Sequence, residues 1–117
     1  MNLFFLKSKI HRARVTDCST DYEGSITIDS GLLGAAKISE FEMVLVANVS
    51  NGSRFETYAI AGKPGSGQVC VNGAAARLCK KGDVVIIMSK CLLNEQEAKV
   101  FTPTVVKLDS ENRILKK

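Results

Sequence analysis

Short segments rich in apolar and β-branched residues, separated by turn signals, constrain the fold of this chain more than any other feature of its sequence. Residues 43–49 and 83–88 are almost continuously apolar, which is typical of strands covered on both faces. Asn51-Gly52 predicts a hairpin turn. The strands predicted in all are 3–16, 25–29, 43–49, 54–60, 83–88 and 104–108. The chain is therefore expected to be mainly β.

Helical segments are few and brief, and two of them belong to an internal repeat. Residues 31–38, 74–78 and 95–99 each have the length of one or two helical turns. Residues 35–38 match residues 75–78 at an offset of 40, and the apolar strands that follow match at the same offset. Either the two units are alike by chance, or they form a small pseudo-symmetric barrel of interlocked strands. A closed barrel leaves no strand edge unpaired.

Length and composition indicate one folded domain over residues 1–117. The 12.7 kDa chain is 45% hydrophobic and 24% charged, which excludes wholesale disorder. No apolar run approaches the roughly 18 residues of a membrane span, and the apolar start is too short for a signal peptide. A cytoplasmic location without a membrane partner is therefore expected. Residues 61–67 are predicted as a surface loop, and the polar tail 109–117 is predicted to fray.

The charge balance favours anionic partners, and the cysteines do not form a metal-binding pattern. Sixteen Lys and Arg residues against twelve Asp and Glu residues give a net charge of +4, which suits nucleic acid, phosphate or small carboxylates. Cys18, Cys70, Cys79 and Cys91 contain no C-x-x-C pair, and His11 is the only histidine, so no metal site is predicted. Four reduced thiols are expected, with Cys70 and Cys79 as small core residues.

The segment Asp21-Tyr22-Glu23-Gly24-Ser25-Ile26-Thr27-Ile28-Asp29 is the most informative in the chain. Taken alone, its Glu-Gly-Ser triplet is an ordinary turn before a strand. Three further motifs accompany it: Lys9-Ile10-His11-Arg12, Asn51-Gly52-Ser53-Arg54-Phe55-Glu56-Thr57-Tyr58-Ala59-Ile60 and Val71-Asn72-Gly73-Ala74-Ala75-Ala76. In this order and spacing, the four motifs resemble the aspartate 1-decarboxylase family, small pyruvoyl-dependent lyases that make β-alanine from L-aspartate for pantothenate. The resemblance runs from about Leu6 to Val106.

The resemblance implies a fold, an assembly and a maturation step. The implied fold is a small double-psi β-barrel with a few short helices, which agrees with the strand pattern. The implied assembly is a homotetramer with active sites between subunits. The implied maturation is a proenzyme that cuts itself between Gly24 and Ser25. Whether that cleavage is spontaneous or needs an accessory activation factor stays open.

The residue types suit such a self-cleavage. The Ser25 hydroxyl attacks the carbonyl of the preceding peptide bond and turns the amide into an ester, and Gly24 has no Cβ to resist the strained backbone that the attack demands. Elimination and hydrolysis then leave a covalently bound pyruvoyl group at the new N-terminus of residues 25–117. The oxyanion formed on the way needs positioned donors, and the resemblance assigns that role to Thr57 and Asn72.

The resemblance also assigns the residues that act on the substrate. The pyruvoyl ketone forms a Schiff base with the amino group of aspartate and accepts the electrons released with carbon dioxide. Arg54 and Lys9 are expected to hold the substrate carboxylates, without a decision on which holds which, and Tyr58 is expected to protonate the carbanion. The other implied substrate contacts are Thr57, Gly73, Ala74 and Ala75, with His11 and Tyr22 in support. Ala47 stands where some relatives carry a bulky aromatic.

Two other functions remain open at this point. A small basic β-barrel can bind nucleic acid without catalysis, although this chain has no Trp and only Phe55 and Tyr58 lie near Arg54. A pyruvoyl decarboxylase of another amino acid would share the internal serine but not the four motifs together. An intact mass separates the classes, because a binding module would stay whole at 12.7 kDa.

Overall fold

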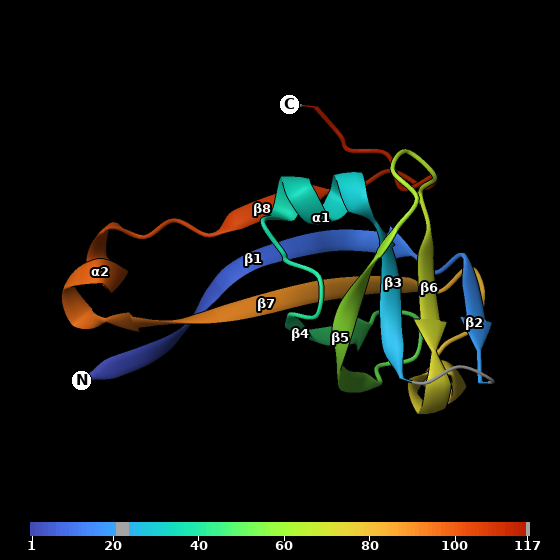
Figure 1. Ribbon diagram of the computed structural model, residues 1–117, viewed down its shortest axis with the longest axis horizontal. Helices are drawn as coiled ribbons and strands as arrows, with labels where there is room; N and C mark the ends of the chain where they lie inside the picture. Colours follow the sequence, from blue (N-terminus) through green and yellow to red (C-terminus); the bar gives the residue numbers. More distant parts are fainter. Residues whose placement is uncertain (21–23, 117) are drawn as a thin grey trace.

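The computed structural model describes residues 1–20 and 24–116, which form strands and three short helices (Figure 1). The strands are β1 (Asn2–Arg14), β2 (Asp17–Ser19), β3 (Ser25–Asp29), β4 (Met43–Asn48), β5 (Arg54–Gly62), β6 (Val69–Asn72), β7 (Val84–Asn94) and β8 (Thr104–Lys107). The helices are α1 (Ser30–Ala36), the 3-10 helix η1 (Gly73–Leu78) and α2 (Glu95–Val100). The predicted mainly β fold is confirmed. Only β2 and β6, of three and four residues, are strands that the sequence did not predict.

The strands form one sheet, in the order β2-β6-β3-β5-β4-β7-β1-β8, that curls into a barrel. The chain that follows β1 contacts β6, so strands near the two ends of the sheet lie close together. There the backbone N–H of Thr16 donates to the carbonyl oxygen of Val69 over 2.8 Å. The chain bends before this point at a bulge, where Arg12 has a φ of +65°. The barrel-like architecture expected from the strand pattern is thereby confirmed.

The two units of the internal repeat are neighbours in the barrel. Helix α1 precedes β4, and η1 precedes β7. Strands β4 and β7 pair antiparallel, and the register partners Val46 and Ile87 are both fully buried. The repeated units therefore pack against each other through their apolar strands, as an interlocked barrel requires.

Strands β4 and β7 are covered on only one face within this chain, which differs from the prediction. On β4, Val44 and Val46 are buried, whereas Met43 on the opposite face is 53% exposed. On β7, Val85 and Ile87 are buried while the residues between them are half-buried. Apolar residues on both sides of these strands thus leave an apolar outer face.

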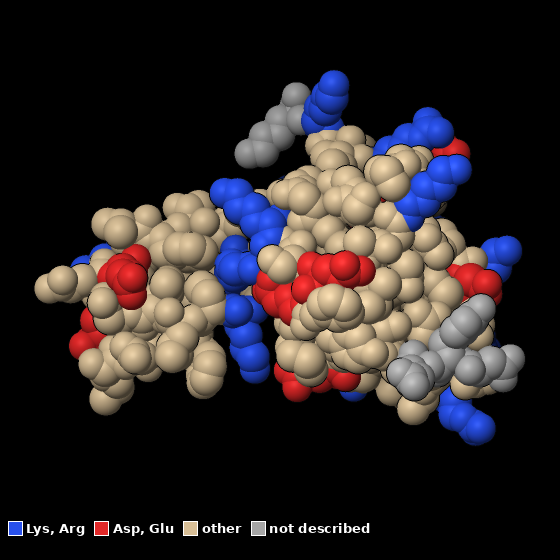
Figure 2. Space-filling model, viewed as in Figure 1, with Lys and Arg blue, Asp and Glu red and all other residues tan. Residues whose placement is uncertain are grey.

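β1 and β7 continue beyond the barrel as a two-stranded arm, formed by residues 2–6 and 90–94 together with α2 (Figure 1). Within it, Phe5 packs edge to face against Phe101, with ring centroids 5.9 Å apart. Phe4 and Leu92, which are register partners, are 77% and 54% exposed. Figure 2 shows that the visible face of the arm is mainly uncharged, while Lys and Arg side chains gather where it meets the barrel. The arm therefore presents apolar side chains that the barrel does not cover.

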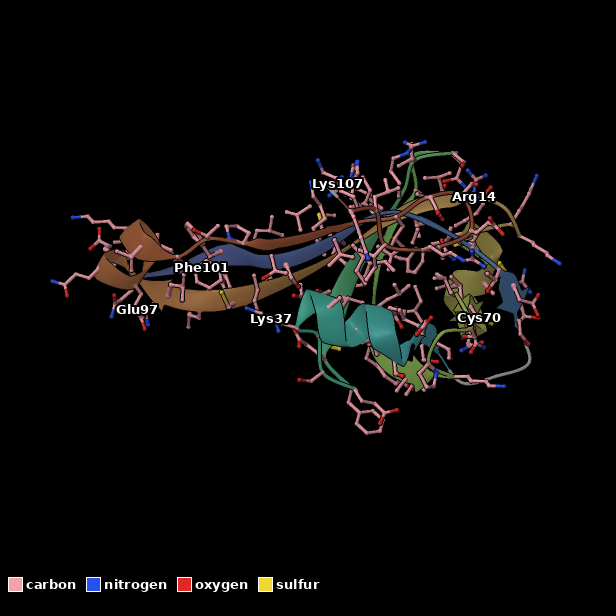
Figure 3. The ribbon with its side chains drawn as sticks, turned by 90° about the horizontal axis from the view of Figure 1, so that it is seen from above. Arg14, Lys37, Cys70, Glu97, Phe101 and Lys107 are labelled. Atoms are coloured by element: carbon pink, nitrogen blue, oxygen red, sulfur yellow. The ribbon has the colours of Figure 1, made fainter. Side chains whose placement is uncertain are left out.

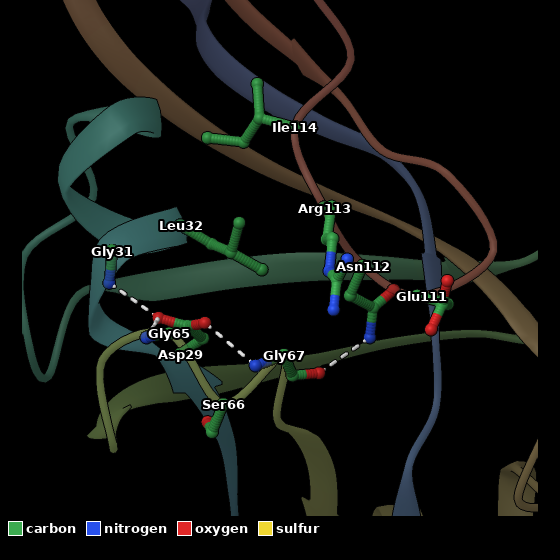
Figure 4. Close-up of a pocket in the computed structure, with 10 residues that line it drawn as sticks. All are labelled: Asp29, Gly31, Leu32, Gly65, Ser66, Gly67, Glu111, Asn112, Arg113 and Ile114. Atoms are coloured by element: carbon green, nitrogen blue, oxygen red, sulfur yellow. Dashed lines mark hydrogen bonds between the residues drawn. The ribbon is translucent and has the colours of Figure 1, made fainter.

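The described part of the C-terminal segment is held against the barrel, so the prediction that residues 109–117 fray is corrected for it. Asn112 is only 3% exposed. Its Nδ2 donates to the carbonyl oxygens of Arg14 and Gly67, each over 2.8 Å, and its Oδ1 accepts from the Arg14 N–H over 2.7 Å. Beside it lies a hollow of about 440 Å³ in which Asp29 accepts backbone N–H bonds from Gly31 and Gly67 (Figure 4). One polar side chain thus fastens the segment by satisfying distant backbone groups.

Candidate active site

A hollow of about 750 Å³ lies on the outer face of the barrel, over β3, β5 and β6. Side chains at alternate positions of a strand share a face, so β5 contributes Tyr58 and Ile60 while β6 contributes Cys70 and Asn72. The described residues that line the hollow are Asp17, Ser19, Ser25, Thr27, Tyr58, Ile60, Gln68, Cys70 and Asn72. The fold therefore brings together Ser25, Tyr58 and Asn72, three of the residues singled out from the sequence.

A hydrogen-bond network centred on Asn72 holds Ser25 in this hollow. Ser25 begins β3, Asn72 ends β6, and the two are antiparallel register partners. Asn72 Nδ2 donates to Ser25 Oγ over 2.9 Å and to Thr27 Oγ1 over 3.1 Å. Asn72 Oδ1 accepts from the thiol of Cys70, whose Sγ is 3.2 Å away. Since Ser25 and Asn72 are only 6% and 8% exposed, these bonds form where little water competes for them.

Gly24 lies immediately before β3 and is exposed. A Cβ built on Gly24 would meet no described atom within 4 Å beyond its chain neighbours. The role of Gly24 in the cleavage stays a prediction. Tyr22, the preceding candidate, lies outside the described residues.

Tyr58 stands next to Ser25 in the sheet. β3 and β5 are parallel, and their first register partners are Ile26 and Ala59. Ser25 and Tyr58 each come directly before that pair, and both line the hollow. The Tyr58 ring also lies beside Phe41, with ring centroids 6.5 Å apart. A phenol in this place can give a proton to a molecule held at Ser25.

Thr57 lies on the opposite face of β5. It is 7% exposed and is the register partner of Val44, a core residue of β4. It is not among the described residues that line the hollow. The roles of Thr57 in self-processing and substrate binding stay predictions.

The two predicted cations, Arg54 and Lys9, both lie outside the hollow of their own chain. Arg54 is exposed at the start of β5, where its register partner is the small Ala47. Lys9 is paired with Met88 of β7 and Val105 of β8. In the sheet order, β4 and β7 separate its strand from β5. The described residues that line the hollow include no Lys or Arg, so they do not supply the positive charge that two substrate carboxylates need.

Gly73, Ala74 and Ala75 follow Asn72 directly and begin η1. Gly73 has a φ of +75°, a conformation that favours glycine and turns the chain sharply after β6. Ala74 is exposed, Ala75 is half-buried and Gly73 is buried, so only part of this small-residue segment reaches the surface next to Asn72.

His11 lies in β1 beside Lys107 of β8 and does not line the hollow. Burial lowers the pKa of His11, and the positive charges of Lys9 and Arg12 lower it further. Within residues 1–20 and 24–116, its buried Nδ1 has no hydrogen-bond partner. The structure thus favours a neutral imidazole at pH 7 but does not connect it to Ser25 within one chain.

The four cysteines lie among the described residues and are free. Cys79 is buried, as predicted, and burial raises the pKa of its thiol to about 11. Cys70 is half-buried and lines the hollow, which corrects its prediction as a core residue. Residues 70 and 72 share one face of β6, a strand that the sequence did not predict. Thr27 was also not singled out from the sequence, although it shares a face of β3 with Ser25 and lines the hollow.

The part of the chain that the structure describes contains no group of three or more His, Cys, Asp or Glu side chains that could hold a metal ion. It also contains no helix long and apolar enough to cross a membrane.

The sequence matches known proteins over almost its whole length. A family model described as aspartate decarboxylase matches residues 1–115. The chain belongs to the aspartate decarboxylase family. The resemblance seen in the four motifs is thereby confirmed, and so is the expectation of an enzyme of the carboxy-lyase class.

Three relatives named aspartate 1-decarboxylase illustrate the closeness of the family match. The protein of Thermoanaerobacter pseudethanolicus is 52% identical over 113 residues, which cover 97% of each chain. That of Dehalococcoides mccartyi (strain 195) is 56% identical over 111 residues, covering 95% of this chain and 90% of the relative. That of Caldicellulosiruptor saccharolyticus is 57% identical over 111 residues, covering 95% of this chain and 87% of the relative.

Proposed function

We propose that this chain converts L-aspartate to β-alanine and carbon dioxide with a pyruvoyl group that it makes from its own Ser25. Membership of the aspartate decarboxylase family supports this substrate. The observation that carries the proposal is the hydrogen bond from Asn72 Nδ2 to Ser25 Oγ inside a hollow with room for a small molecule. The β-alanine would serve pantothenate biosynthesis, and the proposed location is the cytoplasm.

In the proposed cleavage, Ser25 is the nucleophile. Its Oγ bonds to the carbonyl carbon of Gly24, the peptide C–N bond breaks, and the hydroxyl proton passes to the released nitrogen. Elimination across Cα and Cβ of Ser25 then frees the Gly24 carboxylate. Hydrolysis of the remaining dehydroalanine releases ammonia and leaves the ketone. Thr57 and Asn72 are the proposed donors that stabilise charge during the first step.

The residues around Ser25 fit a pyruvoyl group. Asn72 Nδ2 can donate equally to a hydroxyl, an ester oxygen or a carbonyl oxygen, so its bond to this position need not be lost during maturation. When formed, the group accepts the electrons released as carbon dioxide leaves. Tyr58 would donate its phenolic proton to the substrate carbon that loses carbon dioxide, since it stands beside Ser25 and lines the same hollow.

Substrate binding is proposed to involve a second copy of the chain. Aspartate carries two carboxylates, and the side chains able to balance them, Arg54 and Lys9, lie outside the hollow of their own chain. Exposed apolar side chains on the arm and on the outer face of β4 call for a covering surface. A closed homotetramer would cover these surfaces and bring the cations of one copy to the hollow of another. Gly73, Ala74 and Ala75 would let the substrate approach the backbone there.

A denaturing mass spectrum of the purified chain tests the proposal. We expect two fragments, residues 1–24 and 25–117, the larger beginning with a carbonyl that reacts with hydroxylamine. Ser25→Ala should stay whole at 12.7 kDa. Ser19→Ala is the matched control, because Ser19 lines the same hollow and should cleave normally. Cleavage only after an accessory factor is added would identify assisted maturation.

Activity then decides the substrate. The cleaved protein should form β-alanine from L-aspartate and should not decarboxylate L-glutamate at a comparable rate. A protein that remains intact under every condition would contradict the proposal. If the protein cleaves but acts on another amino acid, the proposed substrate is wrong and the proposed self-cleavage still holds.

A further inference from the structure

The amide of Asn72 has two orientations of nearly equal shape, and only one of them suits the Ser25 hydroxyl. Exchanging Oδ1 and Nδ2 leaves the side chain in the same space. In the observed orientation, Nδ2 uses one N–H for Ser25 Oγ and the other for Thr27 Oγ1. The hydroxyls of Ser25 and Thr27 favour neither orientation of the amide, because a hydroxyl can donate or accept a hydrogen bond equally well.

Cys70 is the neighbour that makes the two orientations of the Asn72 amide unequal in energy. Among the described residues, its thiol is the donor to Asn72 Oδ1, with Sγ 3.2 Å away. Turning the amide over would replace this S–H···O bond with an N–H directed at a sulfur, which is a weak acceptor. Cys70 is therefore placed to favour the orientation in which Nδ2 faces Ser25.

The orientation matters for the proton of Ser25. With Nδ2 facing it, Ser25 Oγ accepts from Asn72 and its own proton remains free to leave. With Oδ1 facing it, the Ser25 hydroxyl would donate that proton to the amide and lose it as a transferable group. Once Oγ has become an ester oxygen it can only accept, so Oδ1 would then repel it while Nδ2 would still bond to it.

We propose that Cys70 is a positioning residue that holds the Asn72 amide with its Nδ2 toward Ser25, and that it thereby speeds the cleavage of the Gly24–Ser25 bond. The inference rests on the proposed function, because it assigns a role within that self-cleavage. Figure 3 places Cys70 at the barrel end of the molecule, far from the arm marked by Glu97 and Phe101. Cys70 thus acts at the hollow and lies away from the apolar arm.

The surroundings keep the thiol in its donating form. Burial raises the pKa of Cys70, and the negative charge of Asp17, its register partner on β2, raises it further. Its register partner on the other side is Thr27, a neutral side chain. A protonated thiol at neutral pH is what the bond to Asn72 Oδ1 requires.

The test compares two substitutions at one position by the rate of cleavage, followed by intact mass on freshly made protein. Cys70→Ala removes the donor and should slow cleavage about two- to tenfold, the loss expected for one neutral hydrogen bond. Cys70→Ser keeps a donor of similar size and should restore a rate close to that of the original chain. Cys91→Ala, in the arm, is the matched control and should leave the rate unchanged. Equal rates for Cys70→Ala and Cys70→Ser would overturn the inference.

A second measurement keeps the inference separate from the proposed function. If the original chain does not cleave at all, the proposed function fails, and the side-chain amide signals of Asn72 in an NMR spectrum still report its orientation. Cys70→Ala should broaden or double those signals because both orientations become populated, whereas Cys70→Ser should keep a single set. A single unchanged set in Cys70→Ala would contradict the inference whatever the chain does at Gly24.

Discussion

Arg54 and Tyr58 stand on the same face of β5, and four residues of extended strand separate their Cα atoms by about 13 Å. Tyr58 lines the hollow that contains Ser25, and Arg54 does not. One strand thus carries a group suited to proton transfer and a group suited to charge binding at two separate places. Substitutions at the two positions should therefore affect different steps of the reaction.

Arg54→Ala should weaken substrate binding without preventing cleavage at Gly24. Losing a charge-assisted contact to a carboxylate costs about 2–5 kcal/mol, which lowers kcat/KM by roughly tens- to thousands-fold. Arg54→Lys keeps the charge but loses the bidentate fork, so it should recover part of the loss. Steady-state kinetics on fully cleaved protein measures both. A normal KM in Arg54→Ala would show that another cation holds the substrate.

Tyr58→Phe should leave cleavage and carbon dioxide release intact but misdirect the proton. The substitution preserves the ring beside Phe41 and removes only the phenolic proton. The carbanion would then take its proton at the carbon derived from Ser25, which converts the pyruvoyl group to alanine and inactivates the enzyme turnover by turnover. β-Alanine and the N-terminal mass of the large fragment should be followed together. Sustained, normal β-alanine production would exclude Tyr58 as the donor.

A charge placed on the arm should disrupt the homotetramer. Phe4 is 77% exposed and pairs with Leu92, which is 54% exposed. Phe4→Glu would force a carboxylate into any surface that covers this pair, and burial of an unpaired charge is strongly unfavourable. Light scattering should show smaller particles for Phe4→Glu and tetramers for Ser110→Glu, which adds the same charge at an exposed position away from the arm. A monomeric original chain at micromolar concentration would refute the assembly.

Asp29 should contribute to the acid sensitivity of the fold. Burial raises the pKa of its carboxyl, but N–H bonds from Gly67, Gly31 and Gly65 outweigh burial and bring the pKa below the ordinary 3.8. A carboxyl with a lower pKa in the folded than in the unfolded state stabilises the fold above its unfolded pKa. That stabilisation disappears as the pH falls through the folded pKa.

Asp29→Asn should therefore lower the melting temperature at pH 7 by several degrees, and the difference from the original chain should shrink below about pH 4. Thermal unfolding between pH 3 and pH 7 measures this. Glu111→Gln, at an exposed position lining the same hollow, is the control and should follow the original chain at every pH. A difference that stays constant from pH 7 to pH 3 would contradict the role given to the Asp29 charge.

Strand positions and candidate residues differed in how well they could be predicted. The long apolar segments at 43–48 and 84–88 were found because their pattern is continuous over several residues. β2 and β6 are too short to show a period, so their side chains were not assigned to a face. For this reason Cys70 was placed in the core although it lies in the hollow. The alternation along β5 places Thr57 on the face opposite Tyr58, and its role in the site stays a prediction.

The sequence by itself determined the mainly β character, the brief helices and the family, because hydrophobic periodicity and motif spacing are local properties of the chain. Tertiary structure alone decided that Asn72 faces Ser25 and that Asn112 fastens the C-terminal segment. Each of these contacts joins segments whose register is set by packing between strands distant in sequence. A shift of one residue in β6 would turn Asn72 away from Ser25, and no local pattern specifies that register.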